Sequence, residues 1–259
     1  MLARPINSSA FTVYNSSASI PASDMTLLIS AMNIELAALS KVWGRTQIPV
    51  MAGAGSPPVE QTPMNAWPIY IVDSLDSGVP AGTLGLHDVK SGIPYARVFV
   101  DEIRKVGGVN LYKDTNTITV ASVVFHQLLE MYGDCFANGW SQDGNGDFWA
   151  LELADAVESN IILTNASTMK KVDNKIETIL TPVGLCDYVY PAWFNSHNTT
   201  GPYNRAGNLT KPFQVDKHGY AIIYNGHSYS SIYGSNVTDA TKYKAFADLT
   251  SMKYPSLKV

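Results

Sequence analysis

Residues 119–133 constrain the fold more than any other part of this 259-residue chain. Apolar residues recur there with a helical period, and His126 and Glu130 lie four positions apart. Side chains at that spacing share one face of a helix, with Cβ atoms about 5–6 Å apart. The segment predicts a helix from about residue 117 to 132 that begins at Asn116 or Thr117. Gly133 would follow its end in a left-handed conformation, and the imidazole and carboxylate could bind one metal ion.

The residue after His126 is Gln127. In the His-Glu-x-x-His helix of zinc peptidases, a glutamate at that place is the general base that deprotonates metal-bound water. An amide has no proton-accepting state near neutral pH. The pattern therefore predicts a metal-binding helix that lacks the group needed for hydrolysis.

A zinc site needs at least three protein ligands. Asp155 and Glu158 are the main candidates beside His126 and Glu130, and Asp134 and His87 also carry suitable donor atoms. So many oxygens suit calcium as well as zinc, so the metal identity stays open. The alternative is a buried hydrogen bond between His126 and Glu130 that requires no ion.

Three further residues are candidates for orienting a ligand by hydrogen bonding, namely His87, Asp88 and Asp134. For His87 and Asp88, satisfying buried backbone groups is the simpler interpretation. The stretch 143–147 imitates the start of a calcium loop, but its twelfth position is Ala154 instead of glutamate, which favours a plain solvated turn.

Composition excludes several classes of function. The net charge is −4 and no lysine or arginine cluster occurs, so nucleic acid is not an expected partner. No apolar run approaches the roughly 20 residues of a membrane span, and the first residues lack the basic-then-apolar order of a secretion signal. Cys135 and Cys186 are expected to be buried free thiols.

The pattern of elements indicates an α+β chain forming a single domain, 1–259. Residues 1–20 are expected to be an extended arm or an edge strand, and 24–42 a helix. Strands are expected at 67–73, 82–88, 95–100 and 148–153, a hairpin or meander at 161–180, and an aromatic plug at 189–194. Asn225-Gly226 predicts a type I′ hairpin within a β-rich C-terminal extension, 195–259.

An ordered set of short motifs carries a family resemblance over about residues 40–225. They are Trp67-Pro68, Gly85-Leu-His87-Asp88, Val98-Phe-Val100, His126-Gln-Leu-Leu-Glu130-Met131-Tyr-Gly-Asp134, Ala150-Leu-Glu152-Leu-Ala-Asp155-Ala-Val-Glu158 and Asp187-Tyr-Val-Tyr-Pro191-Ala-Trp193-Phe194. In this set the chain resembles a zincin-like family common in tailed bacteriophages and related bacterial elements. It departs from that family at Gln127, where the family has glutamate, and at Cys135, where it has proline.

The resemblance implies a zincin-like α+β fold, in which a small mixed sheet packs on a central helix and the C-terminal half is β-rich. It also implies a structural component of a tailed-phage virion, in the tail, baseplate or another particle-attached position, with other virion proteins and copies of itself as partners. The low charged fraction of 15% suits such a covered surface. The alternatives are an active metal-dependent peptidase or cell-wall hydrolase carried by the particle, and a module that binds the host surface.

Overall fold

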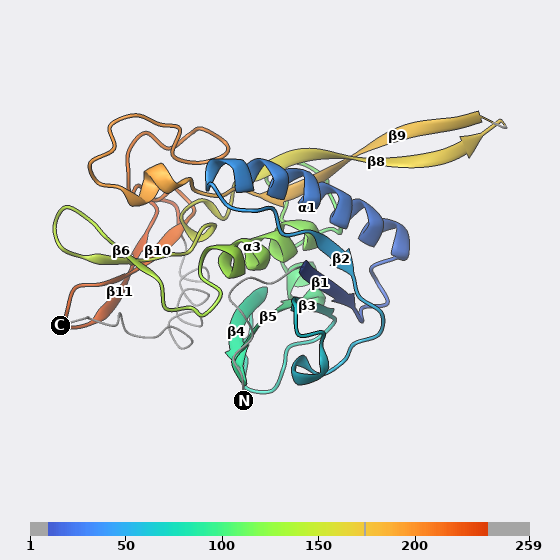
Figure 1. Cartoon of the computed structure of the whole chain (residues 1–259), viewed down its shortest axis with the longest axis horizontal. Coiled ribbons are helices and arrows are strands. Elements are labelled where there is room, and N and C mark those ends of the chain that lie inside the picture. Colours follow the sequence, from blue (N-terminus) through green and yellow to red (C-terminus); the bar gives the residue numbers. More distant parts are fainter. Residues whose placement is uncertain (1–9, 174, 238–259) are drawn as a thin grey trace.

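The fold contains three α-helices and eleven strands in a computed structural model that describes residues 10–173 and 175–237 (Figure 1). The helices are α1 (Ala22–Val42), α2 (Val100–Lys105) and α3 (Val120–Gly133), with short 3₁₀ turns η1 (Val59–Gln61), η2 (Asp155–Val157) and η3 (Pro191–Phe194). The strands are β1 (Ala10–Asn15), β2 (Val50–Ala52), β3 (Ala66–Val72), β4 (Gly85–Lys90), β5 (Ile93–Phe99), β6 (Trp140–Gln142), β7 (Phe148–Ala150), β8 (Ile161–Val172), β9 (Lys175–Cys186), β10 (Tyr220–Tyr224) and β11 (Tyr229–Tyr233). The architecture is α+β, as the sequence predicts.

The N-terminal half is built on a five-stranded mixed sheet in the order β2-β1-β3-β5-β4. Strands β2, β1, β3 and β5 run parallel to their neighbours, and β4 pairs antiparallel with β5 at one edge. The prediction of an extended arm or edge strand for residues 1–20 is wrong for β1, which is an inner strand. Phe11 and Val13 pack into the main core, and Tyr14 stacks on Tyr70 on the opposite face. Residues 1–9 lie outside the described part.

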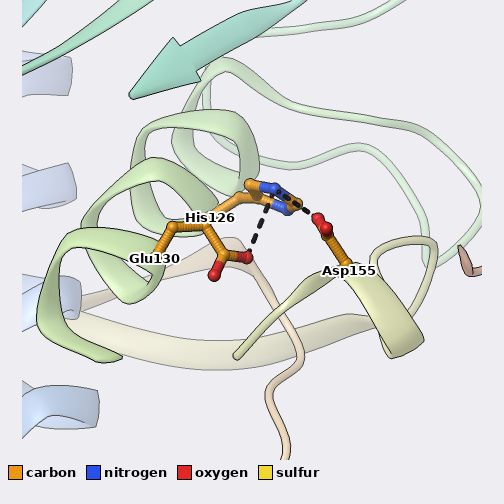
Figure 2. A group of neighbouring side chains, drawn as sticks. All are labelled: His126, Glu130 and Asp155. Carbon is orange, nitrogen blue, oxygen red and sulfur yellow. Dashed lines mark ion pairs between the residues drawn. The ribbon is translucent and has the colours of Figure 1, made fainter. Parts of the chain in front are cut away.

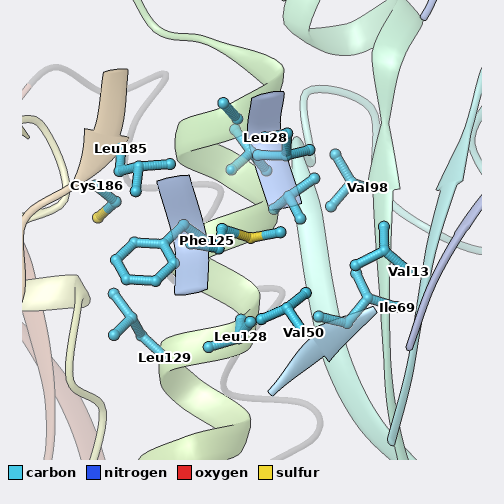
Figure 3. Close-up of a cluster of buried hydrophobic side chains, with 14 of the residues drawn as sticks. Val13, Leu28, Val50, Ile69, Val98, Phe125, Leu128, Leu129, Leu185 and Cys186 are labelled. Carbon is cyan, nitrogen blue, oxygen red and sulfur yellow. The ribbon is translucent and has the colours of Figure 1, made fainter. Parts of the chain in front are cut away.

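Helices α1 and α3 cover one face of this sheet. Figure 3 shows Phe125, Leu128 and Leu129 of α3 between sheet residues such as Val98 and, on the other side, residues of β9. All residues of α3 except Gly133 are buried. Because this helix is covered on all sides, its polar side chains lie inside the protein.

Both long helices confirm the sequence prediction, with differences at their ends. Helix α1 begins two residues earlier than expected. By length and composition alone it is apolar enough to cross a membrane, unlike the expectation from the sequence, but 44% of the apolar window is buried within the protein. Helix α3 begins later than expected because Thr119 caps it: the Thr119 hydroxyl accepts a hydrogen bond from the Ser122 backbone N–H at 2.7 Å.

Gly133 is the last residue of α3, and its conformation is not left-handed, so the expected reason for this glycine is wrong. A Cβ atom there would lie 2.0 Å from Leu153 Cδ1 and 3.2 Å from the Leu151 carbonyl oxygen. Gly133 is therefore required by the close approach of the next chain segment.

The C-terminal half is β-rich. A four-stranded sheet has the order β11-β10-β7-β6, and β8 and β9 form a separate two-stranded ribbon. The predicted strand at 148–153 shortens to β7, while the hairpin expected at 161–180 extends to Cys186. Strands β10 and β11 form the second predicted hairpin, but Tyr224 pairs with Tyr229, so four residues separate the strands in place of a two-residue type I′ turn. Residues 238–259 of the expected extension lie outside the described part.

Candidate metal centre

Three buried side chains from two segments meet beside α3. His126 and Glu130 come from successive turns of the helix, and Asp155 comes from η2 (Figure 2). His126 Nε2 lies 3.5 Å from Glu130 Oε1 and 3.2 Å from Asp155 Oδ1. Among the described residues, these three offer ligand atoms within 4.8 Å of one another, so they could hold a metal ion.

Both distances are compatible with ligands of one ion, and the shorter one is also within the range of a hydrogen bond. Two atoms bound to zinc at about 2.1 Å and separated by a tetrahedral angle lie about 3.4 Å apart. N–H···O hydrogen bonds usually measure about 2.7–3.2 Å. The 3.5 Å separation of His126 and Glu130 is too long for such a bond, and the 3.2 Å separation of His126 and Asp155 is at its upper end.

Backbone donors fix the Glu130 carboxylate. Glu130 Oε2 accepts a hydrogen bond from the Leu153 N–H at 2.7 Å, and Oε1 accepts one from the Ala154 N–H at 2.9 Å. Both donors immediately precede Asp155 in the chain. The same two bonds therefore orient one candidate ligand and position the segment that carries another.

A thiol contacts the other nitrogen of the imidazole. Cys186 Sγ lies 3.8 Å from His126 Nδ1, and the thiol is 3.0 Å from the Asp187 carbonyl oxygen, to which it donates. A proton on Nδ1 directed at the sulfur would leave the Nε2 lone pair facing the two carboxylates. Cys186 was expected to be an ordinary buried thiol, and no local motif links it to a histidine 60 residues away.

The centre concentrates acidic groups away from water. Burial and the nearby Asp155 carboxylate raise the pKa of Glu130 well above its ordinary value. Burial, followed by the charge of Glu130, does the same to the pKa of Glu152. A bound cation would oppose both effects by favouring the ionised carboxylates, so the charge balance as well as the geometry suits a metal ion.

A second polar group borders this centre on the side of β4. The Gln127 side chain is buried against His87, and His87 Nε2 lies 3.8 Å from Glu152 Oε2. Gln127 Oε1, His87 Nε2 and both Glu152 carboxyl oxygens are buried without a hydrogen-bond partner among the described residues. Burial and the neighbouring His126 lower the pKa of His87 to about 4, so this imidazole is neutral at pH 7.

The other residues singled out from the sequence take different places. Glu158 is half-buried, lies outside the group of three, and lines an open pocket of about 740 Å³ with Ser159 and His218. His87 faces Gln127, and strand alternation turns Asp88 to the opposite side, where its Oδ1 accepts from the Val89 N–H. Asp134 directly follows α3, accepts a hydrogen bond from the Gly139 N–H, and helps to raise the pKa of Glu152.

In residues 143–147, which imitate the start of a calcium loop, both oxygens of the Asp143 carboxylate accept hydrogen bonds from the protein. Asp143 Oδ1 accepts from the backbone N–H groups of Asn145 and Asp147 at 2.8 and 3.1 Å, and its Oδ2 accepts from Trp149 Nε1 at 3.0 Å. These bonds close a turn between β6 and β7. The arrangement agrees with the plain turn expected from the sequence.

Comparisons with protein-family models, curated proteins and solved structures yield no match to this chain. The site must therefore be interpreted from its own geometry.

Proposed function

We propose that this protein is a zincin-like structural component of a tailed-phage virion, in the tail, baseplate or another particle-attached position, with a metal ion that stabilises the fold and performs no hydrolysis. The observation that carries the proposal is the group of His126, Glu130 and Asp155, closed inside the protein with Gln127 where a hydrolase needs its base. The family resemblance supports the virion setting, and the antiparallel edge strand β4 beside α3 is compatible with a zincin-like arrangement.

Burial argues against turnover as strongly as Gln127 does. His126, Glu130 and Asp155 are 6%, 1% and 4% exposed, so the described residues leave no space for a substrate to reach the centre. Three protein ligands leave one position of a tetrahedral zinc shell open, as in catalytic sites, so it is the burial of that position that argues against turnover. The ion would join α3 to the segment that follows β7, two parts of the chain separated by more than 20 residues.

Zinc is the first choice for this ion, and calcium is the second. An imidazole ligand favours zinc over calcium, and three protein ligands with one further donor complete a tetrahedral shell. Calcium takes six to eight oxygen ligands, and His126 does not supply oxygen.

Elemental analysis of the purified protein and of two variants tests the metal site. The unmodified protein should contain about one zinc ion per chain, and Asp155→Asn should reduce zinc affinity at least tenfold because it removes a charged ligand. Glu158→Gln is the matched control and should retain zinc. Loss of zinc from both variants alike, or a metal-free protein that gains no thermal stability from added zinc, would contradict the proposed site.

The virion role has a separate test. The protein should be present in purified phage particles at a fixed copy number and remain there through density-gradient separation. Its recovery only as a free protein in the lysate would overturn this part of the proposal and leave the metal site intact.

One observation favours an active hydrolase as the second candidate. Glu152 is a buried carboxyl group whose oxygens have no hydrogen-bond partner within the described part of the chain, and it lies near Glu130 and His87, where it could take the role of the missing base. A peptidase and cell-wall hydrolysis assay should show no zinc-dependent turnover by the unmodified protein. Turnover that Glu152→Gln abolishes would establish the second candidate in place of the first, and Gln127→Glu is the gain-of-function comparison.

A further inference from the structure

Three polar side chains from three separate segments are buried beside the candidate metal centre. His87 comes from β4, Gln127 from α3, and Glu152 from the segment between β7 and η2, and they are 9%, 2% and 4% exposed. Gly85 lies two residues before His87 and therefore on the same face of β4. A Cβ atom at Gly85 would lie 3.1 Å from Gln127 Cγ, which places the Gln127 side chain against this strand. We define His87, Gln127 and Glu152 as the second polar group.

Four polar atoms of the second polar group have no hydrogen-bond partner within the described part of the chain. They are His87 Nε2, Gln127 Oε1 and both carboxyl oxygens of Glu152. Buried polar groups are nearly always hydrogen-bonded, so four such atoms in one group indicate a missing ligand. The 3.8 Å between His87 Nε2 and Glu152 Oε2 is too long for a direct hydrogen bond, but a species lying between the two atoms can contact both.

The chemistry of these atoms favours a cation over a water molecule. A neutral His87 with its proton on Nδ1 presents Nε2 as an acceptor, and Gln127 Oε1 and the oxygens of an ionised Glu152 are acceptors as well. One water molecule donates only two hydrogen bonds, so it would leave two of the four acceptors unsatisfied. A divalent ion binds acceptor atoms alone. Two ligand atoms about 2.1 Å from a zinc ion lie about 3.4–3.8 Å apart at angles of roughly 110–130°, a range that includes the observed distance.

Charge also supports a second ion at this centre. Glu130, Glu152, Asp155 and Asp134 are all at most 8% exposed, and the other three carboxylates all help to raise the pKa of Glu152. When ionised, the four groups together carry a charge of −4. One divalent ion would compensate half of that charge, whereas two divalent ions would balance it.

We propose that the second polar group holds a divalent cation of its own, beside the ion bound by the three residues in Figure 2. His87 supplies Nε2, Glu152 its carboxylate and Gln127 its amide oxygen. Because only one of these ligands is anionic, this ion should bind about tenfold or more weakly than the first and enter when zinc is added to the purified protein. The inference rests on the metal part of the proposed function, and it makes Glu152 a ligand instead of a base.

Zinc titration of the full-length protein after chelator treatment, followed by calorimetry, tests the proposal. The unmodified protein should bind about two zinc ions per chain in two phases. Glu152→Gln keeps the shape of the side chain and removes its charge, so it should weaken the second phase about tenfold or more and leave the first ion bound. Glu158→Gln makes the same change outside both groups and is the matched control, which should retain both phases.

Gln127→Glu tests the same site in the opposite direction. It exchanges the neutral amide oxygen for a carboxylate of nearly the same shape, so the second zinc ion should bind about tenfold or more tightly than in the unmodified protein. A merely structural glutamine would not produce this gain. Circular dichroism of the metal-free variants establishes that each one is folded before the titration.

The outcomes separate this inference from the proposed function. Saturation at one zinc ion per chain would overturn the second site and leave the first in place, whereas no zinc binding at all would overturn the metal part of the proposed function as well. Two ions whose affinities Glu152→Gln and Glu158→Gln change alike would also overturn the second site, because surface carboxylates would then be the ligands. A second-phase affinity that neither Glu152→Gln nor Gln127→Glu changes would do the same.

Discussion

The buried imidazole of His87 should make the protein sensitive to acid. Its pKa is lowered from 6.5 to about 4, mainly by burial. Between these values the unfolded chain binds a proton on His87 that the folded protein does not, so the free energy of unfolding falls as the pH falls. The full effect is about 3 kcal/mol, at roughly 1.4 kcal/mol for each pH unit. Roughly 2 kcal/mol of it should be lost between pH 7 and pH 4.5.

The opposite effect of the acidic groups has to be separated from that of His87. The raised pKa values of Glu130 and Glu152 favour their protonated forms in the folded protein, so their contribution to stability grows as the pH falls toward the ordinary carboxyl value. A comparison of the unmodified protein with His87→Asn removes this shared contribution. The asparagine keeps a polar planar group beside Gln127 and does not titrate.

Urea unfolding followed by tryptophan fluorescence, at pH 7 and pH 4.5 with a chelator present, measures the difference. His87→Asn should lose roughly 2 kcal/mol less than the unmodified protein over this interval. His197→Asn, at an exposed position, is the control substitution. An equal loss in both proteins would refute the reasoning. A larger loss in His87→Asn would mean that His87 is charged in the folded state and paired with Glu152, 3.8 Å away.

Three further predictions test buried contacts elsewhere in the fold. Gly133→Ala should destabilise the protein by about 1–3 kcal/mol in urea unfolding, despite the better helix propensity of alanine, because the new Cβ meets Leu153. A double-mutant cycle with Leu153→Ala should show a favourable coupling energy between the two positions. Additive effects of the two substitutions would contradict the contact. Burial and the nearby Asp134 raise the pKa of Cys135 to about 11, so at pH 8 its thiol should react with a disulfide reagent far more slowly than a free thiol; an equal rate would be inconsistent with that environment. Arg205→Met should lower the free energy of unfolding by about 1–3 kcal/mol, because Glu35 is buried and accepts the Arg205 Nε–H at 3.1 Å, and the partial exposure of the arginine reduces this loss. The double variant Glu35→Gln/Arg205→Met should recover part of the lost stability. Unchanged stability of the single variant would count against the ion pair.

Local pattern predicted the elements better than it predicted their neighbours. The periodicity of α1 and α3 identified both long helices. The local pattern did not identify β1 as an inner strand, because its six residues have mixed polarity. Only the folded structure shows that both faces of this strand are covered. It also gave the wrong reason for Gly133, since a close contact with Leu153 is not visible in the local sequence.

The sequence by itself determined that His126 and Glu130 share one side of a helix, because a four-residue spacing fixes that geometry wherever the helix lies. It also determined that Gln127 cannot serve as a base. Only the tertiary structure placed Asp155 and not Glu158 in the group as its third member, brought Cys186 to the far side of the imidazole, and buried Glu152 beside Glu130 and His87. The positions of these three side chains depend on how segments distant in the sequence pack together. The burial of apolar surface in the whole core determines that packing.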